Sequence, residues 1–375
     1  MIFVSRTDNG ERMEYRDGKR WLWCLSVLSP TVPSLAVLLL AWTANPLFAL
    51  MPVIVYFGVV PLLDALIGED MNNPPDEVVE ALSADPYYRF LLYLALPVFW
   101  ISFLASMWAI ATLGLPLWAN LALAVGAGVA SGSGLTVGHE LGHKPDWPAQ
   151  LGAKLVNAVT GYAHFCIEHN RGHHIMVATP EDPASARFGE NVYRFALREL
   201  PGTARRGWAM ERDRLTKKGL PFWHWRNDLL QGYAITLAVA IALALWLGPW
   251  VLPFVVLHHF VGWLQLTLAN YVEHYGLLRR KLPSGRYEPC QPHHSWNTNH
   301  IASNLMLFHL QRHSDHHANP LRPYQALRNF AELPRLPSGY PGCYFLAHIP
   351  PLWRSIMDPK VMAWAGGDIS KVNRG

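Results

Sequence analysis

The amino-acid sequence predicts an all-α integral membrane protein, with about six transmembrane helices in three hairpins and a histidine-rich cap on their cytoplasmic ends. Three observations support this fold class. Hydrophobic residues make up 51% of the chain and charged residues only 15%, whereas soluble domains contain about 25% charged residues. Three long stretches contain no Asp, Glu, Lys or Arg, and nine of the 18 histidines gather in four short motifs. We expect residues 1–375 to form one domain.

Each charge-free stretch is about twice as long as one membrane crossing, which takes about 20 residues. The stretches cover about 21–63, 90–138 and 229–272. Each contains a break near its middle, where Gly, Pro or Asn interrupts the apolar run, at 43–46, 114–116 and 248–249. Each stretch therefore predicts two helices joined by a short turn.

The charged segments between the hairpins must share one face of the membrane, because the three hairpin turns carry no charge. These segments are 1–20, 64–89, 139–228 and 273–375. Since the N-terminus and the loop at 194–218 are rich in Arg and Lys, the positive-inside rule places this face in the cytoplasm. All four histidine motifs then lie on the cytoplasmic side, and 139–228 and 273–375 form the catalytic segments.

Two further segments give weaker signals. Residues 151–167 are apolar but short and interrupted, and we expect one in-plane or buried helix there rather than a seventh crossing. The chain beyond residue 334 is rich in Pro and Gly. We expect this part to wrap over the cytoplasmic end with little regular structure.

The four histidine motifs predict a metal centre. Spacings of three to five residues place imidazoles on one face of a helix, and neutral imidazole is a common ligand of iron, zinc and copper. Nine imidazoles exceed the ligand number of a single ion and suit two ions side by side. The nine candidate ligands are His139, His143, His169, His173, His174, His274, His313, His316 and His317.

The ligand types favour two irons without excluding other metals. The motifs contain no thiolate, which weakens a structural zinc site, whereas copper is compatible with imidazole ligands. His139, Glu140 and His143 resemble the HExxH motif of zinc proteases, but that reaction leaves six histidines without a role. Four carboxylates beside the histidines are expected to hold imidazole N–H groups. They are Glu140, Glu168, Glu273 and Asp315.

The motifs resemble those of the membrane alkane 1-monooxygenases of bacteria over nearly the whole chain. Residues 270–277 and 310–318 are similar to signatures of that family, and 292–300 and 68–74 also resemble it. The general pattern of three histidine boxes is shared with membrane fatty-acid desaturases and hydroxylases. A related fatty-acyl or xylene hydroxylase, or a desaturase, therefore remains an alternative.

The resemblance implies a specific reaction and specific partners. It implies a di-iron centre, held by the nine histidines, that uses O₂ to convert an n-alkane into a 1-alkanol. Electrons would come from rubredoxin, which an NAD(P)H-dependent rubredoxin reductase reduces. The protein would lie in the bacterial inner membrane, in contact with lipid, with its active site facing the cytoplasm. Nothing in the modest net charge of +4 suggests a nucleic-acid partner.

Two more sets of residues are candidates for substrate and partner binding. An alkane offers no polar group, so an apolar tunnel must orient it, and Tyr56 and Phe57 on the second helix are candidates for the side chains that limit tunnel length. A basic stretch would contact either anionic lipid headgroups or an acidic electron-transfer protein. It contains Arg205, Arg206, Arg212, Arg214, Lys217 and Lys218.

One other function is a weaker interpretation. A metal transporter would need ionisable groups within its membrane spans, and the three stretches contain no Asp, Glu, Lys or Arg. His258 and His259 lie near the start of the sixth helix, away from the motifs, and we expect them to be polar packing or interface residues. We also expect structural roles for the histidines near the motifs, which are His164, His293, His294, His300 and His309.

Overall fold

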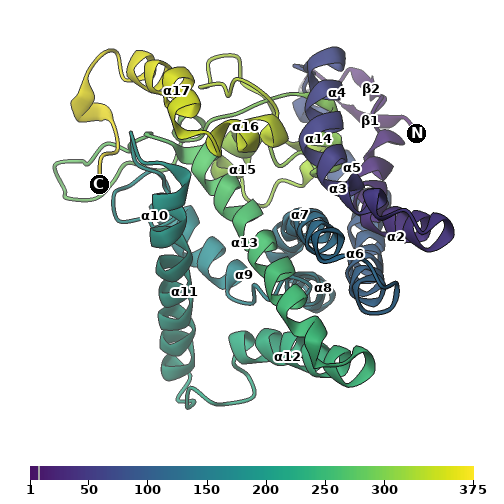
Figure 1. Cartoon of the computed structure of the whole chain (residues 1–375). Coiled ribbons are helices and arrows are strands. Elements are labelled where there is room, and N and C mark those ends of the chain that lie inside the picture. Colours follow the sequence, from purple (N-terminus) through teal and green to yellow (C-terminus); the bar gives the residue numbers. More distant parts are fainter. Residues whose placement is uncertain (7–8) are drawn as a thin grey trace.

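The computed structural model describes residues 1–6 and 9–375, and most of these residues are helical. Six helical stretches are long and apolar enough to cross a membrane, and they follow one another as three hairpins (Figure 1). The prediction of about six transmembrane helices is therefore confirmed. The six stretches are Leu22–Thr43, Pro46–Ile67, Pro86–Thr112, Leu117–Gly142, Asp228–Leu247 and Pro249–His274.

The first hairpin is built from short helical segments, whereas the later hairpins contain long helices. Its first half comprises η1 (Leu22–Cys24), α1 (Leu25–Leu28), η2 (Ser29–Thr31) and α2 (Val32–Thr43). Its second half comprises η3 (Pro46–Leu50), α3 (Met51–Ile54), the π-helical turn η4 (Val55–Val59) and α4 (Val60–Ile67). The later hairpins are α6 (Pro86–Thr112) with α7 (Leu117–Gly142), and α12 (Asp228–Leu247) with η7 (Pro249–Val251) and α13 (Leu252–His274).

The three hairpin turns lie where the sequence predicts them. Each turn contains a residue with positive φ, which is 54° at Ala44, 62° at Gly114 and 90° at Gly248. Pro46 and Pro249 then occupy the first turns of the returning helices, a position where the missing proline N–H costs little.

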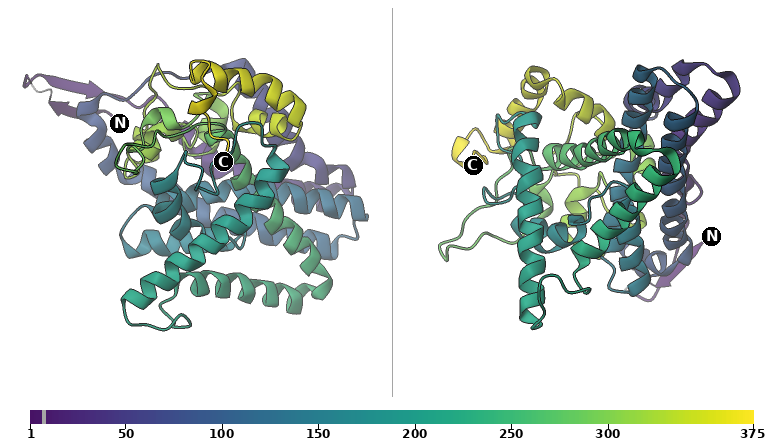
Figure 2. Two further views of the ribbon diagram at one scale, coloured as in Figure 1. Left: turned by 90° about the vertical axis from the view of Figure 1, so that its left-hand side faces the viewer. Right: turned by 60° about the horizontal axis from the view of Figure 1, so that its bottom comes forward.

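The segments outside the hairpins add further helices, including the 26-residue α11 (Val192–Lys217), and an antiparallel β-hairpin in which Phe3 pairs with Tyr15. Figure 2 shows this hairpin projecting from the body, and α16 and α17 side by side near the C-terminus. The strands are β1 (Phe3–Arg6) and β2 (Arg12–Tyr15), and the helices before α12 are η5 (Asp76–Val78), α5 (Val79–Ala84), α8 (Trp147–Ala158), α9 (Phe165–Glu168), η6 (His169–His173), α10 (His174–Met176) and α11 (Val192–Lys217). The helices after α13 are η8 (Pro292–His294), α14 (Ile301–Met306), α15 (His313–Ala318), η9 (Tyr324–Ala326), α16 (Tyr340–Ala347), α17 (Pro350–Trp364) and η10 (Ile369–Lys371).

Two expectations for these segments need correction. The single helix expected over 151–167 is two helices, α8 and α9, separated by turns at 159–164. The expectation of little regular structure beyond residue 334 is wrong, because α16 and α17 form there. Pro341, Pro350 and Pro351 stand in the first turns of these helices, where proline favours a helix instead of breaking it.

Helix α7 is the centre of the bundle and packs against α6, α8 and α13. Its glycines allow this close packing, as is common for membrane helices. A Cβ atom on Gly128 would lie 2.7 Å from the backbone oxygen of His258, and one on Gly132 would lie 2.5 Å from Cγ of Gln265. Because α7 ends with the first histidine motif, this packing also determines where that motif lies.

His258 and His259 are polar packing residues in the first half of α13, as predicted. His258 is buried, and its Nε2 lies 2.9 Å from the hydroxyl of Ser131 on α7. Its Nδ1 lies 3.1 Å from Nδ1 of His259. The pair therefore ties α13 to α7 at a distance from the histidine motifs.

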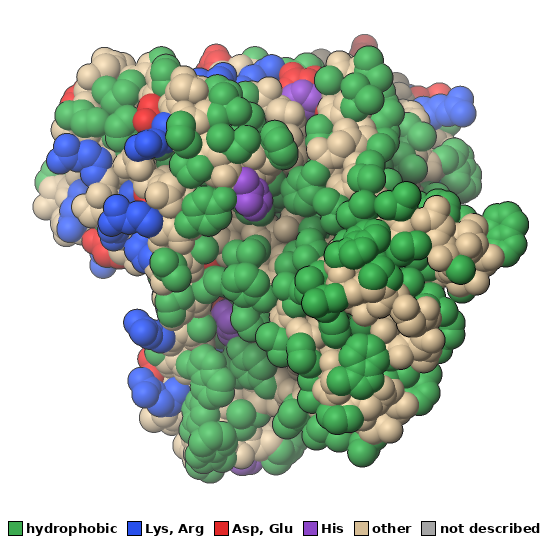
Figure 3. Space-filling model, in the orientation of Figure 1, with side chains coloured by type: hydrophobic (Ala, Val, Ile, Leu, Met, Phe, Trp, Pro, Cys, Tyr) green, Lys and Arg blue, Asp and Glu red, His purple; other side chains and the backbone are tan. Residues whose placement is uncertain are grey.

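The outer surface has an apolar and a charged part. Figure 3 shows hydrophobic side chains over much of one face, while Lys and Arg gather along its upper and left-hand edges, including the edge formed by α11. Trp42 on α2 and Leu245 on α12 are more than four-fifths exposed. In an aqueous protein such exposure of large apolar side chains would be costly, so these surfaces suit contact with lipid.

The close packing of α7 predicts a sharp response to a single methyl group. Gly128→Ala should destabilise the protein by about 1–3 kcal/mol, because the new Cβ meets a backbone oxygen and the Cβ of Val261, at 2.8 Å. Thermal unfolding in detergent measures this change. Gly58→Ala, also within a membrane helix, is the matched control because its Cβ would meet nothing within 4 Å; equal losses of stability in both variants would contradict the packing argument.

Candidate metal centre

The nine candidate histidines come from four parts of the fold that meet at one place. His139 lies in the last turn of α7, and His143 follows that helix. The second motif forms η6 and the start of α10, His274 is the last residue of α13, and the fourth motif lies on α15. In Figure 1, α15 lies beside the end of α13 that carries His274. All nine side chains are buried or half-buried.

The histidines form two neighbouring groups. In each group, one ring nitrogen of every member lies within 4.8 Å of the others. His174 Nε2 is 3.0 Å from His169 Nε2 and 3.1 Å from His316 Nε2, while His313 Nε2 is 2.8 Å from His317 Nε2. The five-histidine group is His139, His143, His169, His174 and His316, and the four-histidine group is His173, His274, His313 and His317.

Two pairs of consecutive histidines divide between the groups. His173 belongs to the four-histidine group and His174 to the five-histidine group. In the same way, His317 and His316 serve different groups. Because consecutive residues on a helix point about 100° apart, each pair presents one ring to each group. The groups are therefore adjacent, and the rings of His174 and His317 lie 4.4 Å apart.

A π-helical turn brings His169 and His174 together. The backbone N–H of His174 donates to the carbonyl oxygen of His169, five residues earlier. The expectation that a five-residue spacing shares one face is wrong for a regular α-helix, but the wider π-turn aligns these two rings. Such turns occur often at functional sites.

The ring nitrogens have the properties of metal ligands. Burial lowers the pKa of His143 to about 4 and holds the pKa of His169 and His174 well below the usual value. These rings are therefore neutral. The Nε2 atoms of His139, His143, His173 and His274 are buried and have no hydrogen-bond partner among the residues that the structure describes. Each unsatisfied buried polar atom costs about 1–3 kcal/mol, and a bound cation would remove that cost, so the donor set fits a metal centre.

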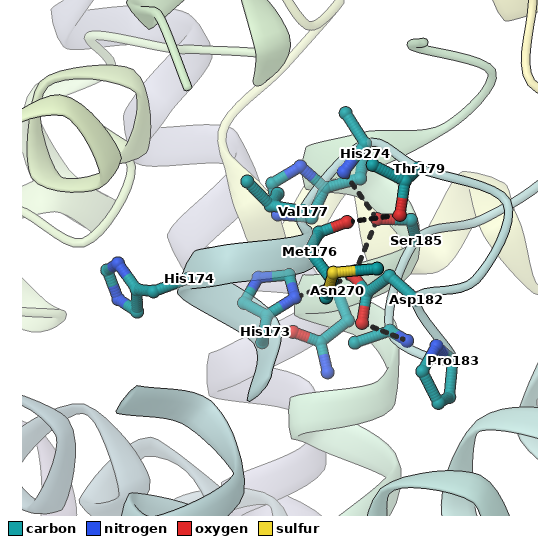
Figure 4. Close-up of polar contacts among 12 residues, drawn as sticks. His173, His174, Met176, Val177, Thr179, Asp182, Pro183, Ser185, Asn270 and His274 are labelled. Carbon is teal, nitrogen blue, oxygen red and sulfur yellow. Dashed lines mark hydrogen bonds and ion pairs between the residues drawn. The ribbon is translucent and has the colours of Figure 1, made fainter. Parts of the chain in front are cut away.

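Asp182 is the carboxylate that orients His173, and the sequence did not reveal it. Its Oδ2 lies 2.8 Å from His173 Nδ1 and accepts from the Ser185 hydroxyl at 2.7 Å (Figure 4). Burial raises its pKa, but His173 and the Arg206 guanidinium outweigh burial and hold the pKa well below its usual range. The ionised carboxylate thus accepts from Nδ1–H and leaves the His173 Nε2 lone pair free for a metal.

The sequence alone does not predict Asp182 as a partner of His173, because no helical spacing links it to the histidines. It lies nine residues after His173, beyond the end of α10, in a loop that contains Pro180 and Pro183. Ala178 in this loop has a positive φ of 56°. The loop therefore turns back on itself, and only the folded chain places Asp182 beside the ring.

Of the four carboxylates expected to hold imidazoles, Glu273 is the one that faces a ring of the two groups. Its Oε2 is 3.2 Å from His313 Nε2, and its Oε1 accepts from the Tyr340 hydroxyl at 2.7 Å. This contact is on Nε2, which also faces His317, so Glu273 lies beside the nitrogen that points into the group. Glu273 is therefore placed to contact a bound ion.

The other three carboxylates hold cations instead, which corrects the expectation for them. Glu140 faces Lys144 at 3.2 Å, one turn later on the same part of the chain. Glu168 binds the Arg206 guanidinium, and Asp315 binds the Arg322 guanidinium at 2.7 Å. A buried carboxylate needs a positive or N–H partner, and these cations are nearer than any Nδ1–H of the motif histidines.

An apolar cavity leads to the histidines. Its walls include Val129, Leu135 and Leu307, and it reaches His139, His169 and His313. Tyr56 and Phe57, the two candidates for limiting tunnel length, both line this cavity from the π-helical turn η4. Tyr56 is buried, and its hydroxyl donates to the carbonyl oxygen of Ser29 at 2.6 Å.

The basic stretch on and after α11 divides into two kinds of residue. Arg206 is held by Glu168 and Asp182, and Arg214 by Glu211 and Asp228. These two guanidinium groups therefore act within the fold. The four remaining side chains are exposed on the surface, and they are Arg205, Arg212, Lys217 and Lys218.

A third cluster, Glu288, His293 and His294, lies near the surface and is a weaker metal candidate. The backbone N–H of Gln291 donates to His294 Nδ1 at 2.9 Å, so the ring proton belongs on Nε2. That nitrogen faces Glu288 Oε1 at 3.3 Å. With this tautomer, His294 donates a hydrogen bond to Glu288 and offers no lone pair to a cation.

Comparisons with known proteins point to one family. Residues 116–346 match the family model described as fatty acid desaturase. An alkane 1-monooxygenase of Pseudomonas putida is 50% identical over 359 residues, which cover 96% of this chain and 89% of the relative. An alkane 1-monooxygenase of Ectopseudomonas oleovorans is 50% identical over 360 residues, covering 96% and 90%. A xylene/toluene monooxygenase hydroxylase component of Pseudomonas putida is more distant, with 29% identity over 231 residues and 61% of each chain.

The contact between Asp182 and His173 predicts a role in metal affinity. Asp182→Asn should weaken metal binding about 10–100-fold, because the ring loses the charged acceptor that orients it. Competition with a chelator, followed by metal analysis of the protein, measures the affinity. Glu211→Gln is the matched control, since Glu211 is an equally buried carboxylate that binds Arg214 away from the histidines. Equal losses of affinity in the two variants would show that Asp182 only supports folding.

Proposed function

The chain belongs to the alkane 1-monooxygenases, within the wider family of the fatty acid desaturase model, and from this premise we propose that it hydroxylates the terminal methyl group of n-alkanes. The observation that carries the proposal is that an apolar cavity reaches three histidines of the nine-histidine centre. A substrate without polar groups can be bound there and oriented by shape alone.

Each histidine group would hold one iron ion, with five imidazoles for one and four for the other. Glu273 would stand beside the ion of the four-histidine group, because it faces His313 Nε2. When bound, the two irons would supply the reductive activation of O₂. A zinc protease is a poorer match, since the base in its HExxH motif would be Glu140, which here faces Lys144.

The cavity would contribute position and exclusion of water. Most of the side chains that line it are apolar. Membrane lipid is apolar too, so an alkane that moves from lipid into the cavity gains little binding free energy. The contribution of the cavity is to hold the chain end-on toward His139, His169 and His313. Fixing the reacting carbon in this way is catalysis by orientation. Tyr56 and Phe57 would then limit the length of chain that fits.

The reaction needs a source of electrons and protons. One alkane, one O₂, two electrons and two protons give one 1-alkanol and one water. We propose rubredoxin as the electron carrier, reduced by an NAD(P)H-dependent rubredoxin reductase. The protein would lie in the bacterial inner membrane with its metal centre facing the cytoplasm.

Metal analysis and product analysis together test this function. Purified protein should contain about two irons per chain, and with ¹⁸O₂, an alkane, rubredoxin and its reductase it should form a labelled 1-alkanol. An alkene without label would assign the protein to the desaturases, and labelled product from xylene but not from alkanes would assign it to the aromatic hydroxylases. Full occupancy by zinc or copper, with no activity after iron is restored, would refute the di-iron centre.

The position of Tyr56 predicts the preferred chain length. Tyr56→Ala should lengthen the cavity and shift the product ratio from a mixture of octane and hexadecane about tenfold toward the longer alcohol. Gas chromatography of the products measures the ratio, which does not depend on the amount of folded enzyme. Val59→Ala is the control, because Val59 is exposed on the same helical turn. An unchanged ratio for Tyr56→Ala would remove Tyr56 from the wall that limits the substrate.

A further inference from the structure

A surface groove contains His294, which contacts His274 of the four-histidine group. Three segments form its walls, at 276–281, 287–294 and 361–372. The first segment begins two residues after His274, the last residue of α13, and the second contains His293 and His294. The groove therefore begins only two residues along the chain from a candidate metal ligand.

The rim of the groove is basic. Arg280, Lys281 and Lys371 are exposed, and two carboxylates lie beside them: Glu288, partly exposed, faces Arg280 at 3.6 Å, and Asp368 faces Lys371 at 3.8 Å. Trp364 adds an exposed aromatic side chain to the same wall. A basic rim around an aromatic side chain is complementary to a protein whose binding face is acidic around an apolar centre.

A short path connects the groove to the four-histidine group. His294 lines the groove, and its backbone carbonyl oxygen lies 3.3 Å from His274 Nδ1. The Ser295 hydroxyl is 3.5 Å from the same nitrogen. Since His274 Nε2 points into the group, one ring and one hydrogen bond separate the groove residue His294 from the metal position.

The basic surface of α11 has no comparable connection. Arg206 of α11 contacts Asp182, which orients His173. This guanidinium is held inside the fold by the carboxylates of Glu168 and Asp182. Lys217 and Lys218 lie at the other end of the helix, about 16 Å further along its axis at 1.5 Å per residue. This end of α11 lies close to the start of α12 (Figure 1), where Arg214 pairs with Asp228, and contact with lipid headgroups is the simpler role for the two lysines.

We propose that the groove at 276–281, 287–294 and 361–372 is the docking site of an acidic one-electron carrier protein, and that electrons enter the metal centre through His294 and His274. This inference rests on the proposed function. Each carrier would be oxidised by one electron per visit, so two visits supply two electrons. Together with two protons and the two electrons of the alkane C–H bond, these convert O₂ into the alcohol oxygen and one water.

A charge reversal on each basic surface tests the proposal. The groove variant is Lys281→Glu with Lys371→Glu, which leaves Arg280, Glu288 and His294 intact. The matched control is Lys217→Glu with Lys218→Glu, which makes the same change of charge on α11. Detergent-purified enzyme is assayed for alkane hydroxylation with reduced rubredoxin over a range of concentrations. Dithionite, a small reductant that needs no docking site, drives a parallel assay.

The groove variant should raise the KM for rubredoxin about tenfold with little change in kcat, because reversed rim charges slow association. Its rate with dithionite should equal that of the unaltered protein, which excludes damage to the metal centre. The α11 control should keep its KM within about twofold. Raised ionic strength should narrow the difference between unaltered protein and groove variant, since salt screens exposed charges.

Other results would overturn the inference. An unchanged KM in the groove variant, or an equal rise in both variants, would show that the groove is not the specific docking site. A rise only in the α11 variant would move docking to that helix. A defect of the groove variant that appears in vesicles of anionic lipid but not in detergent would assign the groove to lipid binding. No product from the unaltered protein with either reductant would instead refute the proposed function, and this inference with it.

Discussion

Nine imidazoles whose ring nitrogens converge on two adjacent positions are the constraint on which the rest of this structure depends. Buried nitrogen atoms without partners are costly, and they can gather only if rigid elements hold their backbones in place. The glycines of α7 supply part of this rigidity, because they let α13 approach until atoms are in contact. The helix ends that carry His139 and His274 are thereby fixed relative to each other.

The charged residues of the motifs contribute mainly to this frame. Glu168 and Asp182 both bind Arg206, which ties the second motif to α11. Asp315 and Arg322 perform the same role for α15. Arg312, buried beside the fourth motif, donates to backbone oxygens of Asp70 and Leu327. Ion pairs of this kind cost desolvation energy, so their value here lies in positioning the ligands.

The sequence was sufficient for the parts of the fold that depend on composition along the chain. Charge-free stretches predicted the three hairpins and their turns, and the histidine spacing selected nine residues that the structure gathers in two groups. Features that depend on contacts between distant segments were not predictable. The pairing of Glu168 with Arg206 of α11 belongs to this class, and the contact of Asp182 with His173 depends on how the intervening loop folds. The π-turn of η6, the Lys144 partner of Glu140 and the Arg322 partner of Asp315 are local, and histidine spacing alone does not predict them. The helices α16 and α17 were missed for a different reason, because prolines that begin a helix look the same in sequence as prolines that prevent one.

The two metal positions are coupled, because two pairs of consecutive histidines divide between the groups. These pairs are His173 with His174 and His316 with His317. Each pair shares one short helical segment, so a displacement that withdraws a ring from one group also moves a ring of the other. A protein with one ion bound would hold both helices in nearly the geometry that the second ion requires. Uptake of the two ions is therefore expected to be cooperative, with half-loaded molecules scarce at every metal concentration.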